Sequence, residues 1–461
     1  MVQGSQGALP WTRGLLFRLA TLFVLGVMLM VPLLSIGGLV QERQKARDLV
    51  VQEIARSAAY AQTITGPILL VPYVRTVTEQ QLEGTRTVLV TREVAGELRL
   101  LPQRFDLAGK LTTQERQRGI YRARIFDAAN RISGHFDVPG HFGIGTDLQS
   151  YRFGAPRLVL GISDIRGIGN ALSVQANGAT VAFVPGTGTT LLSSGVQAPL
   201  SLADAPGSQQ LEFAIDLPLQ GTGSFQVTPL GRDSHVTLAS DWPHPSFVGE
   251  YLPKTRAVSD AGFSAEWQTS YFATNAEEKL SRCAVSEREP TCAEFNALHF
   301  GVSFIDPVDQ YMKSNRAVKY GFLFIALTFA GFFLLEVLRR IAVHPVQYGL
   351  VGFALAMFFL LLLSLSEHIG FGAAYLVSAS ACAGLIGYYV THVLDSAAIG
   401  AAFGAVLGVL YALLYAILGS EDYALLTGAL LVFGVLALIM VLTRKVDWYA
   451  VGRSPAPGPR G

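Results

Sequence analysis

Residues 345–390 have the sequence PVQYGLVGFALAMFFLLLLSLSEHIGFGAAYLVSASACAGLIGYYV, in which Glu367 is the single acidic residue and no Lys or Arg occurs. A helix of about 20 apolar residues crosses a hydrocarbon core about 30 Å thick, and this stretch contains two such lengths. Ser366-Glu367-His368 separates the two lengths. We therefore predict transmembrane helices at residues 345–365 and 369–390, joined by a tight polar loop.

Similar apolar runs occur on both sides of this stretch, at residues 19–40, 320–338, 396–418 and 423–442. Helices of a soluble bundle would each carry a polar stripe, and these runs do not. Hydrophobic residues make up 51% of the chain and charged residues 15%, a composition typical of membrane proteins. The sequence therefore predicts an integral membrane α-helical protein with six transmembrane helices, the first of them an uncleaved signal anchor.

The charged residues gather between two of these runs. Residues 41–319 contain 27 of the 35 Lys and Arg and 28 of the 34 Asp and Glu. Residues 41–63 lack Gly and Pro and predict a helical stalk, and residues 64–319 follow a different pattern. There, residues 211–217 alternate apolar with polar or small side chains, and Asn177-Gly178 is a two-residue hairpin signal. Further strand candidates are 68–77, 86–92, 121–126, 157–162, 172–176, 179–183, 224–229, 235–238 and 263–272.

Many short strands separated by turn residues favour a large all-β or mostly β domain, sandwich-like, or two packed β subdomains. The short loops between the helices predict its location. Arg339 and Arg340 precede the third helix, and Arg444 and Lys445 follow the sixth, whereas the loops at 366–368 and 419–422 contain no Lys or Arg. We therefore predict cytoplasmic ends at 1–18 and 443–461 and a periplasmic domain. Basic clusters on both sides of the domain favour the opposite orientation. However, the rule that basic residues stay in the cytoplasm applies mainly to short loops, and long translocated domains are largely exempt from it.

Two of the three cysteines, Cys283 and Cys292, lie in the domain predicted to be periplasmic. Zinc ligation is the alternative, but no second Cys/His pair at ligand spacing accompanies them. An oxidising compartment favours a disulfide. Closing this loop would contribute roughly 2.5–3 kcal/mol in the chain-entropy model.

Three features near the membrane are candidate sites. Glu367 and His368 form an ionisable pair in the predicted loop, either as a simple polar turn or as a group that takes a proton or docks the external domain. Glu336 and Arg340 have the spacing of a helical ion pair at a membrane end. The glycines that share one face of the fifth helix, Gly400, Gly404 and Gly408, predict close helix packing within the bundle or in a dimer.

Signatures of catalysis are missing from the sequence. It has no nucleophile elbow, P-loop or zinc-protease motif, and His135 and His141 lack a neighbouring carboxylate or Cys cluster in sequence. No basic stretch with interleaved aromatic residues suggests nucleic-acid binding. We therefore predict a protein that is not an enzyme and needs no cofactor or metal.

Several longer motifs resemble those of one family. Residues 65–73 (TGPILLVPY), 240–247 (SDWPHPSF) and 262–272 are similar to blocks in the external domain of CreD inner-membrane proteins. Residues 344–348 (HPVQY), followed by 360–365 and 366–371 (SEHIGF), give the most specific match. The chain is thereby identified as a member of the CreD family over roughly residues 41–442.

The resemblance implies a role in cell-envelope integrity or envelope stress, with links to the CreBC two-component system, to colicin tolerance and to the β-lactam response. It brings no reaction, ligand or catalytic residue. The function we predict is a non-enzymatic inner-membrane protein whose periplasmic domain binds an envelope component or a membrane protein, with the lipid bilayer around it and oligomers allowed. A transporter or flippase built on the C-terminal helices is the alternative, although ion-coupled transporters usually keep more charge in their spans. A periplasmic enzyme ranks third.

Overall fold

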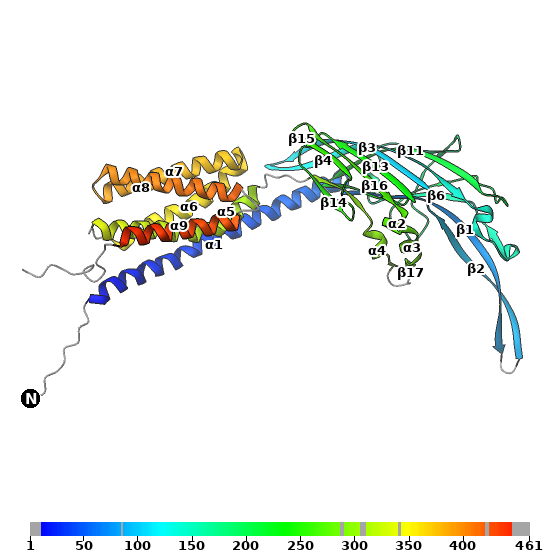
Figure 1. Ribbon diagram of the computed structural model, residues 1–461, viewed down its shortest axis with the longest axis horizontal. Coiled ribbons are helices and arrows are strands. Elements are labelled where there is room, and N and C mark those ends of the chain that lie inside the picture. The colour runs from blue at the N-terminus through cyan, green and yellow to red at the C-terminus, as the bar shows by residue number, and fades with distance from the viewer. Residues whose placement is uncertain are drawn as a thin grey trace, which may run out of the picture. The chain divides into compact units, whose positions relative to one another are not determined.

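The computed structural model describes residues 11–83, 86–285, 290–304, 310–339, 343–419 and 424–444. The chain divides into two compact units, Met1–Arg47 with Val308–Gly461 and Asp48–Pro307. The first unit is helical and the second mostly β (Figure 1). We describe each unit separately.

Six helices of the described chain are long and apolar enough to cross a membrane, which confirms the predicted number. They are α1 (Trp11–Ser57), α5 (Gln310–Arg339), α6 (Pro345–Ile369), α7 (Phe371–Val393), α8 (Ala397–Gly419) and α9 (Ala424–Thr443). One hydrophobic core joins α1 and α5–α8, and aromatic residues such as Phe324, Phe358 and Tyr411 lie at its centre. None of the residues whose exposure is described in α9 is buried.

Two helices extend beyond their apolar runs. The first span and the predicted stalk form the single helix α1, which ends at Ser57 rather than at residue 63, because the strand β1 (Gln62–Glu83) begins there. Helix α5 starts at Gln310, ten residues before the predicted span. Its first turns contain polar residues, which a helix tolerates. The apolar run therefore gives the bounds of the membrane segment but not those of the whole helix.

The start of α6 explains the HPVQY motif. His344 is the N-cap, where its Nδ1 accepts from the amide of Val346 at 3.3 Å. The side chain of Gln347 accepts from the amide of His344 at 3.0 Å, so the two residues form a capping box. Pro345 follows the cap, where its fixed φ suits the first turn and its missing N–H costs nothing.

The end of α6 corrects the predicted loop. Ser366, Glu367 and His368 belong to the last turn of the helix, which continues to Ile369. Gly370 alone separates α6 from α7, with φ of +79°. A residue with a Cβ would be strained at this angle, so Gly370 supplies the turn that we had assigned to the three polar residues.

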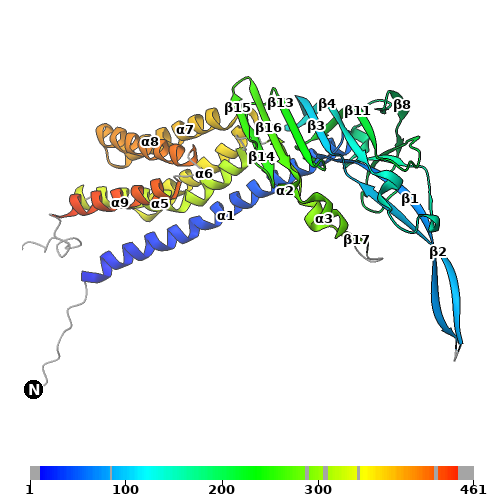
Figure 2. The same ribbon diagram turned by 45° about the vertical axis from the view of Figure 1, so that its right-hand side comes forward.

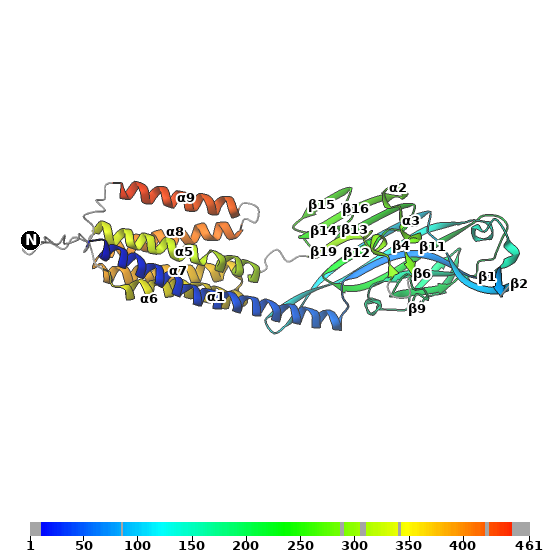
Figure 3. The same cartoon turned by 90° about the horizontal axis from the view of Figure 1, so that it is seen from below.

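The β unit contains two large sheets (Figures 1 and 3). Sheet A has the order β14 (Pro245–Gly249), β19 (Phe300–Phe304), β12 (Ser224–Thr228), β1, β6 (Arg157–Ile162), β10 (Gly195–Pro199) and β9 (Val184–Pro185), and β2 (Arg86–Leu100) and β5 (Tyr151–Phe153) also pair with β1. Sheet B has the order β15 (Thr255–Ser259), β16 (Gly262–Ser270), β13 (Asp233–Ser240), β3 (Arg104–Arg118), β4 (Tyr121–Val138), β11 (Gln209–Thr222), β7 (Ser173–Ala176) and β8 (Ala179–Ala182). The strands β1 and β2 continue beyond the sheet as a two-stranded ribbon (Figure 2).

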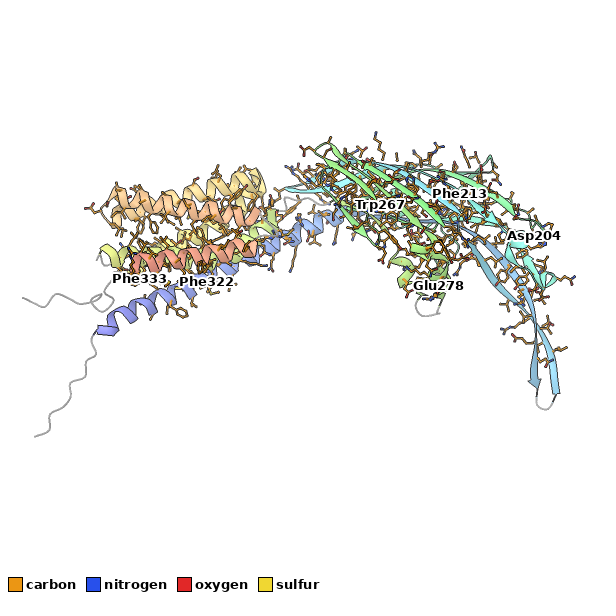
Figure 4. All side chains as sticks on the ribbon, viewed as in Figure 1. Asp204, Phe213, Trp267, Glu278, Phe322 and Phe333 are labelled. Atoms are coloured by element: carbon orange, nitrogen blue, oxygen red, sulfur yellow. A yellow bond between two sulfur atoms is a disulfide. The ribbon has the colours of Figure 1, made fainter. Side chains whose placement is uncertain are left out.

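One core fills the space between the two sheets, which confirms a mostly β, sandwich-like domain. Leu211, Phe213, Ile215 and Leu217 are buried while the residues between them are not, so the alternation in the sequence marks the inward face. Phe213 and Trp267 belong to this core (Figure 4). The predicted hairpin joins β7 to β8, with positive φ at both Asn177 and Gly178.

The apolar run Ile68-Leu69-Leu70-Val71 is buried on both faces of β1. Leu69 and Val71 face the core between the sheets, and Ile68 and Leu70 face a second, smaller core. The second core includes Leu280 of α3 (Ala276–Ser281) and residues around α4 (Ala293–Asn296). This double burial explains why the run does not alternate.

Side-chain contacts fasten the last turn of α1 to the β domain. Arg166 donates to the carbonyl of Arg56 at 2.7 Å and forms a paired contact with Asp164. The Oδ2 atom of Asp164 also accepts a hydrogen bond from the amide of Tyr60 at 3.0 Å. Hydrogen bonds from the Arg166 guanidinium and from the backbone amides of Tyr60 and Arg166 hold the pKa of Asp164 at about 2, although partial burial opposes the shift.

Candidate functional site

Glu367 lies where three helices of the membrane unit meet. Its Oε1 accepts from the Tyr311 hydroxyl of α5 at 3.0 Å and lies 4.0 Å from Nε of Arg43 on α1. The Glu367 side chain is 9% exposed, whereas that of Arg43 is 47% exposed. The Arg47 guanidinium lies 5.7 Å from the Tyr311 ring. A carboxylate that is nearly out of water is therefore held by one phenol and one cation, as a buried charge requires.

The structure separates the two residues of the predicted pair. His368 is exposed at the end of α6, while Glu367 faces the other helices. Neighbouring residues on a helix do not share a face. The candidate therefore reduces to Glu367, and its partners Tyr311 and Arg43 are residues that the sequence did not single out.

Glu336 forms a second contact of the same kind. It is 6% exposed and its Oε2 accepts from the Tyr348 hydroxyl at 2.7 Å. Tyr348 is itself buried and its ring packs on Phe329 and Phe332. The predicted partner Arg340 lies outside the described residues, so the predicted ion pair stays a prediction.

The two contacts are reciprocal. Helices α5 and α6 are antiparallel neighbours, and each contributes a tyrosine near its start and a glutamate near its end. Tyr311 pairs with Glu367 at one end of the helix pair, and Tyr348 pairs with Glu336 at the other. We call these two contacts the Tyr–Glu clasps. Sliding of one helix along the other would break both clasps at once.

The predicted glycine stripe divides in the structure. A Cβ on Gly400 would lie 2.7 Å from the carbonyl of Gly387, and one on Gly404 would lie 3.5 Å from the Gly387 Cα. The close crossing of α7 and α8 therefore requires glycine at Gly400, whereas a Cβ on Gly404 would be in ordinary van der Waals contact. A Cβ on Gly408 would meet no atom within 4 Å, so Gly408 is not part of the crossing.

Cys283 and Cys292 form a disulfide, with Cα atoms 4.8 Å apart. Both residues are buried beside Leu280 and Phe295 in the smaller core. Each of the two histidines weighed as metal ligands has one acidic neighbour. His141 Nδ1 lies 2.8 Å from Asp204, labelled in Figure 4, and His135 Nε2 lies 3.9 Å from Asp137. Among the described residues, no three His, Cys, Asp or Glu side chains are grouped so that they could hold a metal ion.

The outer face of sheet B is hollowed into a trough, which no pattern in the sequence predicted. Its larger part, about 480 Å³, has a floor of small side chains from neighbouring strands. The floor includes Ala108, Ala129, Thr237, Ala239 and Ser264. Because long side chains are absent from these outward positions, the sheet surface lies open between the rims. A second, polar hollow shares Glu266 with this one, and we call the two together the sheet B trough, the second being its polar end.

The polar end of the trough, about 260 Å³, carries charges of both signs. His235 Nε2 lies 2.9 Å from Glu266 and its Nδ1 lies 4.0 Å from Asp106, which Arg104 contacts at 2.6 Å. Hydrogen bonds from His235 and from the Thr255 hydroxyl hold the pKa of Glu266 below its ordinary value. This end can donate and accept hydrogen bonds and suits a polar ligand.

Comparisons with known proteins agree with the family resemblance. A family model described as inner membrane protein CreD matches residues 14–449. Inner membrane protein CreD of Escherichia coli (strain K12) is 36% identical over 436 residues, which is 95% of this chain and 94% of that protein. Among solved structures, a mutant M1 zinc metallopeptidase from Deinococcus radiodurans has a TM-score of 0.22 and 13% identity, and the match covers 44% of this chain and 42% of that one. Another structure of that mutant scores 0.21. At such scores the likeness says nothing about fold or activity.

Proposed function

Because the chain belongs to the CreD family of inner membrane proteins, we propose that it supports the integrity of the cell envelope without catalysing a reaction. Its β domain lies in the periplasm and binds an envelope component there. The membrane helices hold the domain at the surface of the inner membrane.

The observation that carries this proposal is the sheet B trough. Ligand sites are concave and combine an open surface with a few placed polar groups. The trough has a small-residue floor and, at one end, the linked side chains of Asp106, His235 and Glu266. Donors and acceptors both line this end, which favours an extended polar chain over an apolar one.

The periplasmic location rests on the basic residues in the short loops. Arg339 precedes the third membrane helix and Arg444 follows the sixth, and basic residues favour the cytoplasmic side. Six spans then place both ends of the chain in the cytoplasm. The polar trough fits a domain that lies in water, among envelope polymers.

Filling the trough tests the proposal. In cells that lack the chromosomal copy, Ala239→Arg should fail to restore resistance to envelope stress, because an arginine on the floor blocks the ligand. The matched control is Ala214→Arg on β11. Ala214 also points to the outer face of sheet B but does not line the trough. Membrane levels are measured by immunoblot alongside survival in detergent and β-lactam.

The two variants must differ if the trough binds the ligand. Ala239→Arg at wild-type level should be sensitive while Ala214→Arg is resistant. Full resistance with Ala239→Arg would exclude the trough as the binding surface.

A further inference from the structure

A groove of about 540 Å³ lies between α7 and α8. Its walls carry small residues and tyrosine rings, and its bottom is left open where Gly408 has no side chain. The close crossing at Gly387, Gly400 and Gly404 lies beyond the groove on both helices. Figures 1 and 2 show α7 and α8 side by side along their length.

The length of the groove along α7 matches the thickness of one leaflet of a bilayer. On α7 it extends from Gly372, at the start of the helix, to Ala383. Eleven residues of helix rise about 17 Å, which is about half of a 30 Å hydrocarbon core. The groove therefore opens at one membrane surface and ends near the middle.

The walls suit a hydrocarbon chain. Both helices are membrane spans, and Leu376 and Tyr415 on the groove wall are exposed, so the groove faces lipid. The Tyr375 hydroxyl donates to the carbonyl of Tyr411 at 2.7 Å, so it presents its ring to the groove. Filling such a groove with an acyl chain recovers contacts that an empty groove lacks.

One basic side chain and one helix start lie near the open end of the groove. The Tyr415 ring stacks on the Phe371 ring at 6.5 Å, and Nζ of Lys313 lies 5.8 Å from the same Phe371 ring. The N-terminus of α7 is at the same place, and its N-cap residue is Gly370, which has no side chain to cap the helix. Free amide groups at a helix start and a nearby ammonium both favour a phosphate.

From this arrangement we propose that the groove is a site for an anionic phospholipid. One acyl chain lies along α7 and α8 between Tyr375 and Gly408, and the phosphate lies at the start of α7 beside Lys313. The inference goes beyond the proposed function, because it concerns the membrane unit and does not involve the trough.

Native mass spectrometry of the full-length protein in detergent tests the site, with phosphatidylglycerol and phosphatidylethanolamine supplied in equal amounts. The wild type should retain phosphatidylglycerol in preference. Lys313→Gln should reduce that preference about fivefold, the factor expected for one basic residue at a membrane surface. Lys319→Gln on the same helix is the matched control and should keep the preference.

Gly408→Leu tests the acyl chain. The leucine fills the groove, and retention of both lipids should fall by about tenfold or more, since the apolar contact area of a chain is lost. Gly384→Leu on α7 is the control, because its Cβ also meets no atom within 4 Å but it does not line the groove. Thermal unfolding of both variants shows that the bundle is intact.

Three results with the two phospholipids would overturn the proposal. They are equal retention of the two lipids by the wild type, wild-type retention in Gly408→Leu, and equal losses in Gly408→Leu and Gly384→Leu. Displacement of phosphatidylglycerol by an equimolar polyprenyl phosphate would also overturn it, by assigning the groove to a different lipid.

Discussion

The hydroxyls of Tyr311 and Tyr348 each donate to a carboxylate that is almost out of water. Removing either hydroxyl leaves an acceptor without that donor. Hydrogen bonds between membrane helices contribute modestly on average, and those to charged groups contribute more. The clasps therefore belong to the interactions that set the stability of the α5–α6 pair.

We expect Tyr348→Phe to lower the free energy of unfolding by about 1–2 kcal/mol, because the hydrogen bond from the Tyr348 hydroxyl to Glu336 is then lost in an apolar setting. Unfolding in mixed micelles of increasing SDS fraction measures the change. Tyr388→Phe is the control, since the Tyr388 side chain is 68% exposed. Equal stability of the two variants would mean that the clasp contributes nothing measurable.

Asp164 gives a prediction for pH. Its pKa is lowered to about 2 in the folded protein from an ordinary value of 3.8. A lowered pKa stabilises the folded state above the unfolded pKa, and this stabilisation is lost as pH falls from about 4 towards 2. We therefore expect Asp164→Asn to lower the unfolding temperature of the β domain at pH 7 and to differ less from wild type at pH 2.

Tryptophan fluorescence of the full-length protein follows this unfolding, since Trp267 is buried in the core of the domain. Asp260→Asn, in an exposed turn, serves as the matched control. A difference between Asp164→Asn and wild type that is the same at pH 7 and pH 2 would contradict the assignment.

At the level of elements, the crossing of α7 and α8 depends on glycine. Gly400→Ala places a methyl group 2.7 Å from the carbonyl of Gly387, so the helices must separate. We expect a loss of about 1–3 kcal/mol in unfolding free energy. Gly408→Ala should change it by less than about 0.5 kcal/mol, because a Cβ there meets no neighbour. Unfolding in SDS compares the two variants. Equal effects would refute the claim that Gly400 lies at the helix crossing and Gly408 does not.

Elements with a strong local signal could be predicted from the sequence. The membrane helices follow from unbroken apolar runs, and the β7–β8 hairpin follows from Asn177-Gly178. Strand β3 was missed, since its last residues, such as Arg116, are polar and exposed and its partners β4 and β13 lie elsewhere in the chain. Strands β10, β14, β15 and β19 were also missed; each has five residues, and β10 and β14 contain both Gly and Pro, which strand patterns usually avoid.

The candidate sites were predictable only in part. An isolated carboxylate such as Glu336 or Glu367 stands out in an apolar run. Its tyrosine partner does not, because tyrosine is common near membrane surfaces and the pairing depends on how α5 and α6 align. The sheet B trough arises from small residues on five different strands, and no local pattern in the sequence joins them.

For the whole molecule, we expect both ends of the chain in the cytoplasm and the β domain in the periplasm. A reporter fused after Trp448 should behave as cytoplasmic, and one inserted at Ser259, in the exposed edge strand β15, as periplasmic. The basic residues in the short loops are the physical reason. Reporters in the opposite compartments would refute the layout.

The disulfide provides an independent measurement of the same layout. A periplasmic domain should show the Cys283–Cys292 linkage in non-reduced peptides analysed by mass spectrometry, because that compartment is oxidising. Cys382, buried in the membrane unit, is the free-thiol reference. Free thiols at both Cys283 and Cys292 in protein taken from cells would contradict the periplasmic location.

The Tyr–Glu clasps have a consequence for the membranes in which the protein can work. Tyr348 and Glu367 are 19 residues apart on α6, a rise of about 28 Å, close to the thickness of an ordinary hydrocarbon core. A helix pair fastened at both ends cannot lengthen or shorten by sliding when the lipid chains change. In a thicker bilayer the surrounding lipid must thin, and in a thinner one the pair must tilt as a unit. Because of the clasps, a mismatch between helix length and bilayer thickness is accommodated by deformation of the lipid or by tilt of the helix pair. The packing between α5 and α6 does not change.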